Sequence, residues 1–186
     1  MAHSSSDREN KKTLEIKQSF LASAISDIST YIQLTDTKVS IIMGAVVAIL
    51  VGIVACYEPI GDVVNKIMPC SWKSVLLIFF IVIGLISTIL VFIFGIMTVR
   101  GHLCIIDYKS KWFLPKSCKE YSFAEFTRDI QNMNDTDIIV NMAAELYKLN
   151  DINRQKSRSM KWTLYAFSVL LIVIACVAIL FLVSIM

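Results

Sequence analysis

The chain has 186 residues, 56% of them hydrophobic, and a mean hydropathy of +0.65. Its 18 Lys and Arg and 15 Asp and Glu give a formal net charge of +3. The hydrophobic share exceeds the about 45–50% that is usual for soluble domains, so the composition indicates a membrane protein rather than a soluble one.

Few residues are available for catalysis or metal binding. The chain has two histidines and five cysteines, and no two cysteines have the CxxC spacing of a zinc site. Residues 100–161 contain a single glycine, so they have no glycine-rich loop to hold a phosphate. We therefore expect no catalytic residue, metal or cofactor, no nucleic acid partner, and a protein that is not an enzyme.

The N-terminal region precedes the first apolar run. Residues 1–12 are expected to be disordered because small polar residues bury too little surface to offset the entropy of ordering. Residues 13–38 are expected to form a cytoplasmic amphipathic helix. Its apolar seam could pack on the cytoplasmic segment of the same chain or on a second copy. The seam residues follow spacings of four and three: Leu14, Gln18, Leu21, Ile25, Ile28 and Ile32.

Three apolar runs predict transmembrane helices, at residues 39–57, 75–99 and 162–186. Each is close to or above the about 20 residues needed to cross a bilayer, and none carries a charge. Residues 100–161 hold 11 of the 18 Lys and Arg, whereas the loop 58–74 holds two. The positive-inside rule therefore places 100–161 and the N-terminus in the cytoplasm, and the loop 58–74 and the C-terminus outside.

The segment between the second and third spans is expected to be a small helical module. Ser122 and Glu125 have the spacing of a capping box, which starts a short helix. From Thr136 to the C-terminus there is no Gly or Pro, so one helix can run through the module and the third span. The predicted fold is an all-α membrane protein with three transmembrane helices and a small helical cytoplasmic module between the second and third.

The first span has two further features. Asp36, Thr37 and Lys38 stand at its entry, where they could cap the helix, meet the headgroups or couple the span to the cytoplasmic module. Small side chains then recur at every fourth residue, which favours close approach of a second helix, either internal or from another subunit. These residues are Ser40, Gly44, Ala48, Gly52 and Cys56.

Three motifs together resemble a known family. Asp36-Thr37-Lys38 opens the first span, Asp129, Ile130 and Met133 stand on the short helix, and the run NMAAELYKLNDINRQK (residues 141–156) leads into the third span. In this order they resemble the membrane effectors of Pycsar, a bacterial antiphage system in which the effector is paired with a pyrimidine cyclase. The resemblance covers the chain from about Thr30 to its end.

The resemblance implies a receptor for cyclic CMP or cyclic UMP that impairs the bacterial inner membrane and causes abortive infection by cell death. Such a nucleotide needs a cation for its phosphate, an aromatic face for its base and polar groups for its edges. If the resemblance holds, the ligand-binding candidates of the cytoplasmic module are Arg128, Glu145, Tyr147, Lys148, Asn150, Asn153, Arg154 and Lys156.

No span contains an ionisable residue, so an ion-selective pore within one subunit is disfavoured and rearrangement of a homo-oligomer in the bilayer is the expected action. Two other functions fit the same features. A ligand-independent holin-like toxin would need no charged module. A membrane scaffold or accessory subunit would bind a protein partner through residues 13–34.

Overall fold

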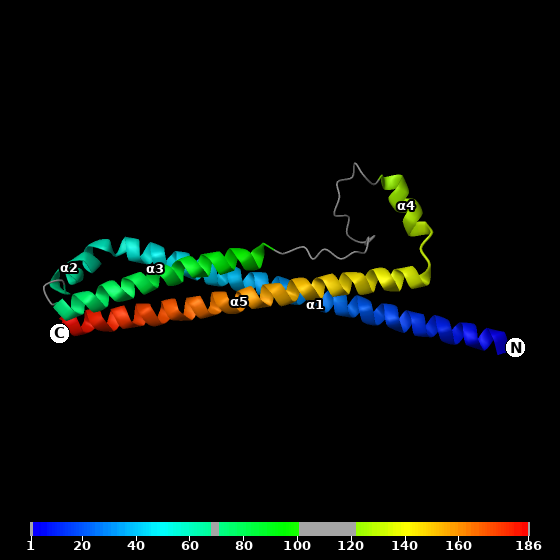
Figure 1. Cartoon of the computed structure of the whole chain (residues 1–186), viewed down its shortest axis with the longest axis horizontal. Coiled ribbons are helices and arrows are strands. Elements are labelled where there is room, and N and C mark those ends of the chain that lie inside the picture. Colours follow the sequence, from blue (N-terminus) through cyan, green and yellow to red (C-terminus); the bar gives the residue numbers. More distant parts are fainter. Residues whose placement is uncertain (1, 68–70, 101–121, 186) are drawn as a thin grey trace. The chain divides into compact units, whose positions relative to one another are not determined.

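The computed structural model describes residues 2–67, 71–100 and 122–185, and all of the regular structure in these ranges is helical. Figure 1 shows the helices in chain order. The prediction of an all-α protein is confirmed. The helices are α1 (Ala2–Ala55), α2 (Tyr57–Ile67), α3 (Ser71–Val99), α4 (Phe123–Gln131) and α5 (Asp135–Ile185).

Three of these helices are long and apolar enough to cross a membrane, as the sequence predicts. The spanning stretches fall within Lys11–Ala55, Trp72–Val99 and Asp135–Val183. The chain is therefore a multi-pass membrane protein with three spans. The predicted continuous last helix is also present, since α5 has 51 residues without interruption.

Two segments differ from the sequence prediction. Residues 2–12, expected to be disordered, belong to α1, because Lys, Glu and Arg are good helix formers and extending an existing helix avoids the cost of nucleation. The segment 58–74, expected to be a loop, contains α2 and the start of α3. Val63 and Val64 of α2 pack against Leu77 and Leu180, and burial of this apolar face stabilises the helix.

The chain divides into two compact units. Unit 1 comprises residues 1–33 and 102–154, and unit 2 comprises residues 34–101 and 155–186. The N-terminal part of α1 thus belongs to the same unit as most of the predicted module, and packing of its apolar seam on that module or on a second copy stays a prediction. The part of the predicted module at 101–121 lies outside the described residues.

The core of unit 2 lies among the three spanning helices. Ile42 and Val46 of α1, Val91 of α3, and Ala166 and Leu170 of α5 form one buried cluster. On α1 the buried positions Thr35, Val39, Ile42 and Val46 follow spacings of four and three, which is the pattern of helices packed at a shallow angle. In the spanning part of α5 the buried positions follow spacings of three, four, three and seven: Thr163, Ala166, Leu170, Val173 and Leu180.

In unit 1, α4 begins with the predicted capping box. The Ser122 hydroxyl accepts from the Glu125 backbone N–H, and the Glu125 carboxylate accepts from the Ser122 backbone N–H. The hydrogen bonds that Ser122 donates to the Glu125 carboxylate, chiefly the one from the backbone N–H, hold the pKa of Glu125 below its ordinary value. At the start of α5, the Asp137 carboxylate accepts from the Asn134 backbone N–H.

Candidate functional site

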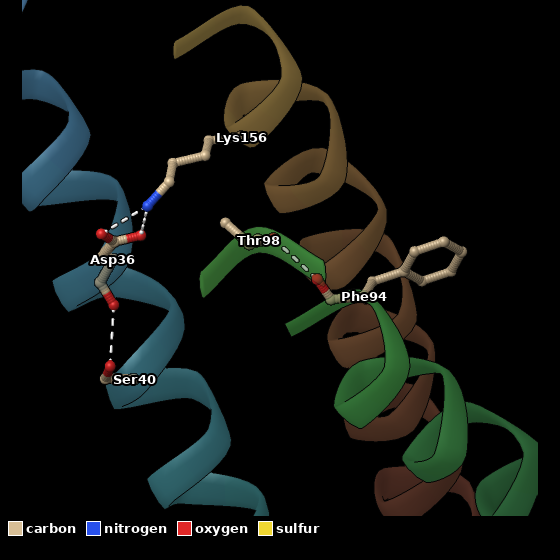
Figure 2. A network of polar contacts seen from close by, with 5 residues as sticks. All are labelled: Asp36, Ser40, Phe94, Thr98 and Lys156. Atoms are coloured by element: carbon tan, nitrogen blue, oxygen red, sulfur yellow. Dashed lines mark hydrogen bonds and ion pairs between the residues drawn. The ribbon is translucent and has the colours of Figure 1, made fainter. Parts of the chain in front are cut away.

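An ion pair joins α1 to α5 in unit 2, where the two helices become apolar. The Lys156 ammonium donates to both carboxylate oxygens of Asp36, at 2.6 and 2.7 Å. Figure 2 shows the two side chains pointing toward one another. The Lys156 side chain is only 8% exposed, whereas the Asp36 side chain is 36% exposed. An ammonium withdrawn from water in this way requires a counter-charge, which Asp36 provides.

Three hydroxyls near this pair donate within their own helices. Thr98 of α3 and Thr163 of α5 are fully buried, and they donate to the carbonyls of Phe94 at 2.8 Å and Ser159 at 3.1 Å. Ser40 donates to the Asp36 carbonyl at 2.9 Å (Figure 2). These bonds hold each helix internally, so the Asp36–Lys156 pair contributes polar contact between α1 and α5.

The sequence placed Asp36 in a group for coupling at the membrane entry and Lys156 in a group for ligand binding. The structure brings these two together and places Lys156 in unit 2, with the spans. Thr37 and Lys38, the other residues proposed for coupling, are exposed. The coupling role of the three entry residues stays a prediction.

A second polar feature lies in unit 1, on α5. The Lys148 ammonium is 3.9 Å from Oε2 of Glu145, and the side chains are 17% and 14% exposed respectively. This Oε2 is buried and accepts no hydrogen bond from the described residues. A buried carboxylate oxygen without a donor is costly, so this atom is an exception among the buried polar atoms of the described residues.

The remaining ligand-binding candidates lie on α4 and α5 and do not share one face. Successive helical residues are about 100° apart, so the candidates on α5 cannot all share one face. Asn153 is half-buried, and Asn150 donates to the Leu146 carbonyl of its own helix at 3.1 Å. Among the described residues, no group of three or more His, Cys, Asp or Glu could hold a metal ion. The exposed candidates are Arg128, Tyr147, Asn150 and Arg154.

The ridge of small residues on α1 is exposed over its whole length, from Ser40 to Cys56. A Cβ atom added at Gly44 or Gly52 would meet nothing within 4 Å. Packing inside unit 2 uses another face of α1, which carries Val39, Ile42 and Val46. The ridge is therefore not occupied by α3 or α5.

Sequence reasoning missed the close contact that the bundle does make. A Cβ atom at Gly95 of α3 would lie 2.8 Å from Sδ of Met43 and 3.6 Å from Cγ1 of Val39. Gly84 of α3 is near Val173 of α5, at 3.5 Å on the same measure. The sequence did contain a sign of this packing face. Gly84, Val91, Gly95 and Thr98 follow one another at spacings of seven, four and three, which places them on one face of α3.

Comparison with known proteins identifies the chain at the level of its family. A family model described as Pycsar effector protein domain matches residues 20–184. No curated protein and no solved structure matches the chain. The matched range includes all three spans, the ion pair of Asp36 and Lys156, and the Glu145–Lys148 pair. The chain therefore belongs to the Pycsar effector family and is an effector of antiphage defence.

Proposed function

We propose that this effector senses a cyclic pyrimidine nucleotide, cyclic CMP or cyclic UMP, through unit 1. Binding then impairs the integrity of the bacterial inner membrane, and the infected cell dies before the phage matures. In this proposal a pyrimidine cyclase supplies the nucleotide, and the N-terminus and unit 1 face the cytoplasm while the C-terminus lies outside. Family membership supports the pairing with a cyclase system.

The observation that carries the proposal is the buried Oε2 atom of Glu145, which accepts no hydrogen bond from the described residues. Cytosine presents an exocyclic amino group, uracil a ring N–H and ribose a hydroxyl, and each can donate to a buried carboxylate oxygen. The Lys148 ammonium lies beside the same oxygen and offers a cation to the cyclic phosphate. A hydrogen bond to a charged group contributes about 1.5–3 kcal/mol, so this one contact could supply an appreciable part of the affinity.

Transmission to the membrane is supported by helix continuity. The helix that carries Glu145 continues without interruption into the third span. In this proposal, no flexible loop stands between the nucleotide site and the span. A ligand shifts a conformational equilibrium only by its differential affinity, so unit 1 must bind the nucleotide more tightly in the active state. The exposed ridge on α1 is suited to a second copy of the chain, through which a homo-oligomer would open the bilayer.

Binding can be measured directly with the purified full chain in detergent. Cyclic CMP and cyclic UMP are titrated by calorimetry, with cyclic AMP and linear CMP as controls. Glu145→Gln should weaken binding of the preferred pyrimidine about 10- to 100-fold, as expected for a hydrogen bond to a charged group. Asp27→Asn, at an exposed carboxylate on α1, is the matched control and should leave the affinity unchanged. Failure of both pyrimidine nucleotides to bind would refute the sensor proposal.

A cellular experiment separates the three functions. The effector is expressed alone, with an active pyrimidine cyclase and with an inactive one, and membrane potential is followed with a fluorescent dye. We expect the potential to collapse only with the active cyclase. Collapse without a cyclase would instead indicate a holin-like toxin. A steady potential in all three strains would refute membrane impairment and favour a scaffold.

A further inference from the structure

A basic and aromatic patch covers one outward face of α5 at the end of the span. Arg158 and Lys161 are exposed, and so are Trp162 and Tyr165. Their separations of three and four residues place them on one face of the helix. This face lies away from Lys156, which points into the bundle toward Asp36. The four residues are named the α5 patch below.

The aromatic members place the patch at the level of the membrane interface. Trp162 stacks on Phe94 of α3 with 6.1 Å between ring centroids, and it meets Tyr165 edge-on at 6.0 Å. Exposed Trp and Tyr side chains typically lie at headgroup level. Arg158 and Lys161 precede Tyr165 on the helix, so at about 1.5 Å per residue they stand within about 10 Å of it.

Two further cations stand at the same end of the spans, on the other helices of unit 2. Lys38 on α1 follows the ion-paired Asp36 by two residues, and Arg100 directly follows α3. Both are exposed, and neither they nor Arg158 and Lys161 form an ion pair within residues 2–67, 71–100 and 122–185. The carboxylate at this end, Asp36, is already neutralised by Lys156.

The resulting charge is strongly uneven between the two ends of the spans. Asp36, Lys38, Arg100, Lys156, Arg158 and Lys161 at one end sum to +4, since five cations stand against one carboxylate. At the other end Glu58, Asp62, Lys66 and Lys73 sum to zero. On α5 the cations stand beside two exposed aromatic side chains, Trp162 and Tyr165.

We propose that the α5 patch, with Lys38 and Arg100, binds the phosphate headgroups of anionic phospholipids and makes the protein prefer bilayers that contain them. Arg158 offers fork geometry to a phosphate, and Lys161 adds a second charge one turn away. Trp162 and Tyr165 pack against the glycerol and upper acyl region of the same lipids. The occupant is a lipid because the patch is at the interface and its chemistry combines anion binding with apolar contact.

The test uses the full chain in detergent, without any nucleotide, so that its outcome is independent of ligand sensing. Native mass spectrometry measures the dissociation constants of phosphatidylglycerol and phosphatidylcholine with matched acyl chains. We expect phosphatidylglycerol to bind at least about 25-fold more tightly, about fivefold for each of Arg158 and Lys161. R158Q/K161Q should reduce that preference by about fivefold for each cation removed, the factor that corresponds to one cation near an anionic surface.

Two control variants isolate the patch from net charge and from folding. K11Q/K12Q removes the same charge at exposed positions of unit 1 and should keep the preference. R158K/K161R keeps the charges and should also keep the preference, with helix content checked by circular dichroism. Equal binding of the two lipids, an unchanged preference in R158Q/K161Q, or equal losses in K11Q/K12Q would each overturn the proposal.

Discussion

Replacing Asp36 by Asn should destabilise the bundle of α1, α3 and α5 more than replacing Lys156 by Met. The two residues form one ion pair but differ in exposure. Without the Asp36 carboxylate, an ammonium that is only 8% exposed is left without its counter-charge. Without the Lys156 ammonium, the remaining carboxylate is 36% exposed, so water and headgroups can still solvate it.

The magnitude follows from the geometry. At the observed 2.6 and 2.7 Å, Coulomb's law gives about 6 kcal/mol for an effective dielectric constant of about 20 and about 1.5 kcal/mol in water. Desolvation of Lys156 opposes this attraction, so the net coupling should be about 2–3 kcal/mol. Asp36→Asn should cost about 3 kcal/mol and Lys156→Met about 1 kcal/mol. The double variant should cost about 1 kcal/mol, because it leaves no charge unpaired.

The assay is equilibrium unfolding of the purified chain in mixed micelles of a mild detergent and dodecyl sulfate, followed by far-ultraviolet circular dichroism. Asp27→Asn and Lys38→Met, at exposed positions of α1, are the matched controls and should each change the unfolding free energy by less than about 0.5 kcal/mol. The reasoning would be refuted if Asp36→Asn cost no more than Lys156→Met, or if the double-mutant coupling were below about 0.5 kcal/mol.

Three other substitutions test the packing and the cap. Gly95→Leu should destabilise the bundle by about 2 kcal/mol or more because a Cβ atom there already approaches Met43 at 2.8 Å, whereas Gly44→Leu should leave unfolding unchanged; similar losses in both would contradict this. Gly44→Leu combined with Gly52→Leu should instead change the oligomeric state or killing, and parental behaviour would leave the ridge without a role. Thr98→Val should change the unfolding free energy by less than about 1 kcal/mol because, among the described residues, its hydroxyl bonds within its own helix; a larger loss would indicate a further partner. Because the folded pKa of Glu125 is lowered, its ionised carboxylate stabilises α4 fully at pH values above the ordinary pKa of 4.5, and this stabilisation is lost as the pH falls through the lowered pKa. The protection of α4 against hydrogen exchange, relative to the intrinsic rate at each pH, should therefore fall in that range in the parent chain but not in Glu125→Gln.

The elements that local rules determine were predictable from the sequence. A charge-free apolar run long enough to cross a bilayer has few alternatives to a helix, so the three spans followed directly. The cap of α4 depends on Ser122 and Glu125 alone, which are three residues apart. The length of α5 followed from the lack of Gly and Pro after Thr136, since nothing else in that stretch ends a helix.

Pairing between distant segments was harder to predict. Lys156 resembled the other basic residues before the third span, and only its position relative to Thr163 and Leu170, at intervals of seven, marks it as a residue of the buried face. Its partner Asp36 is 120 positions away and could equally have capped a helix. The ridge on α1 was a strong packing signal, but the bundle uses Gly95, because the contact requires space opposite Met43 and Val39.

Two charged residues on α5 differ in whether their polar atoms have partners. Lys156 and Glu145 are eleven residues apart, which is one heptad plus four residues, so both lie on the same face of the helix. The charge of Lys156 is matched by two short bonds to Asp36, and its contribution to the free energy of folding is already made. Among the described residues, Oε2 of Glu145 accepts no hydrogen bond, and the Lys148 ammonium lies 3.9 Å from it. Under the proposed function, a ligand that donates to this oxygen would gain free energy that the unliganded chain does not have. The same proposal gives Lys156 no part in binding the nucleotide, because its ammonium is already paired with Asp36.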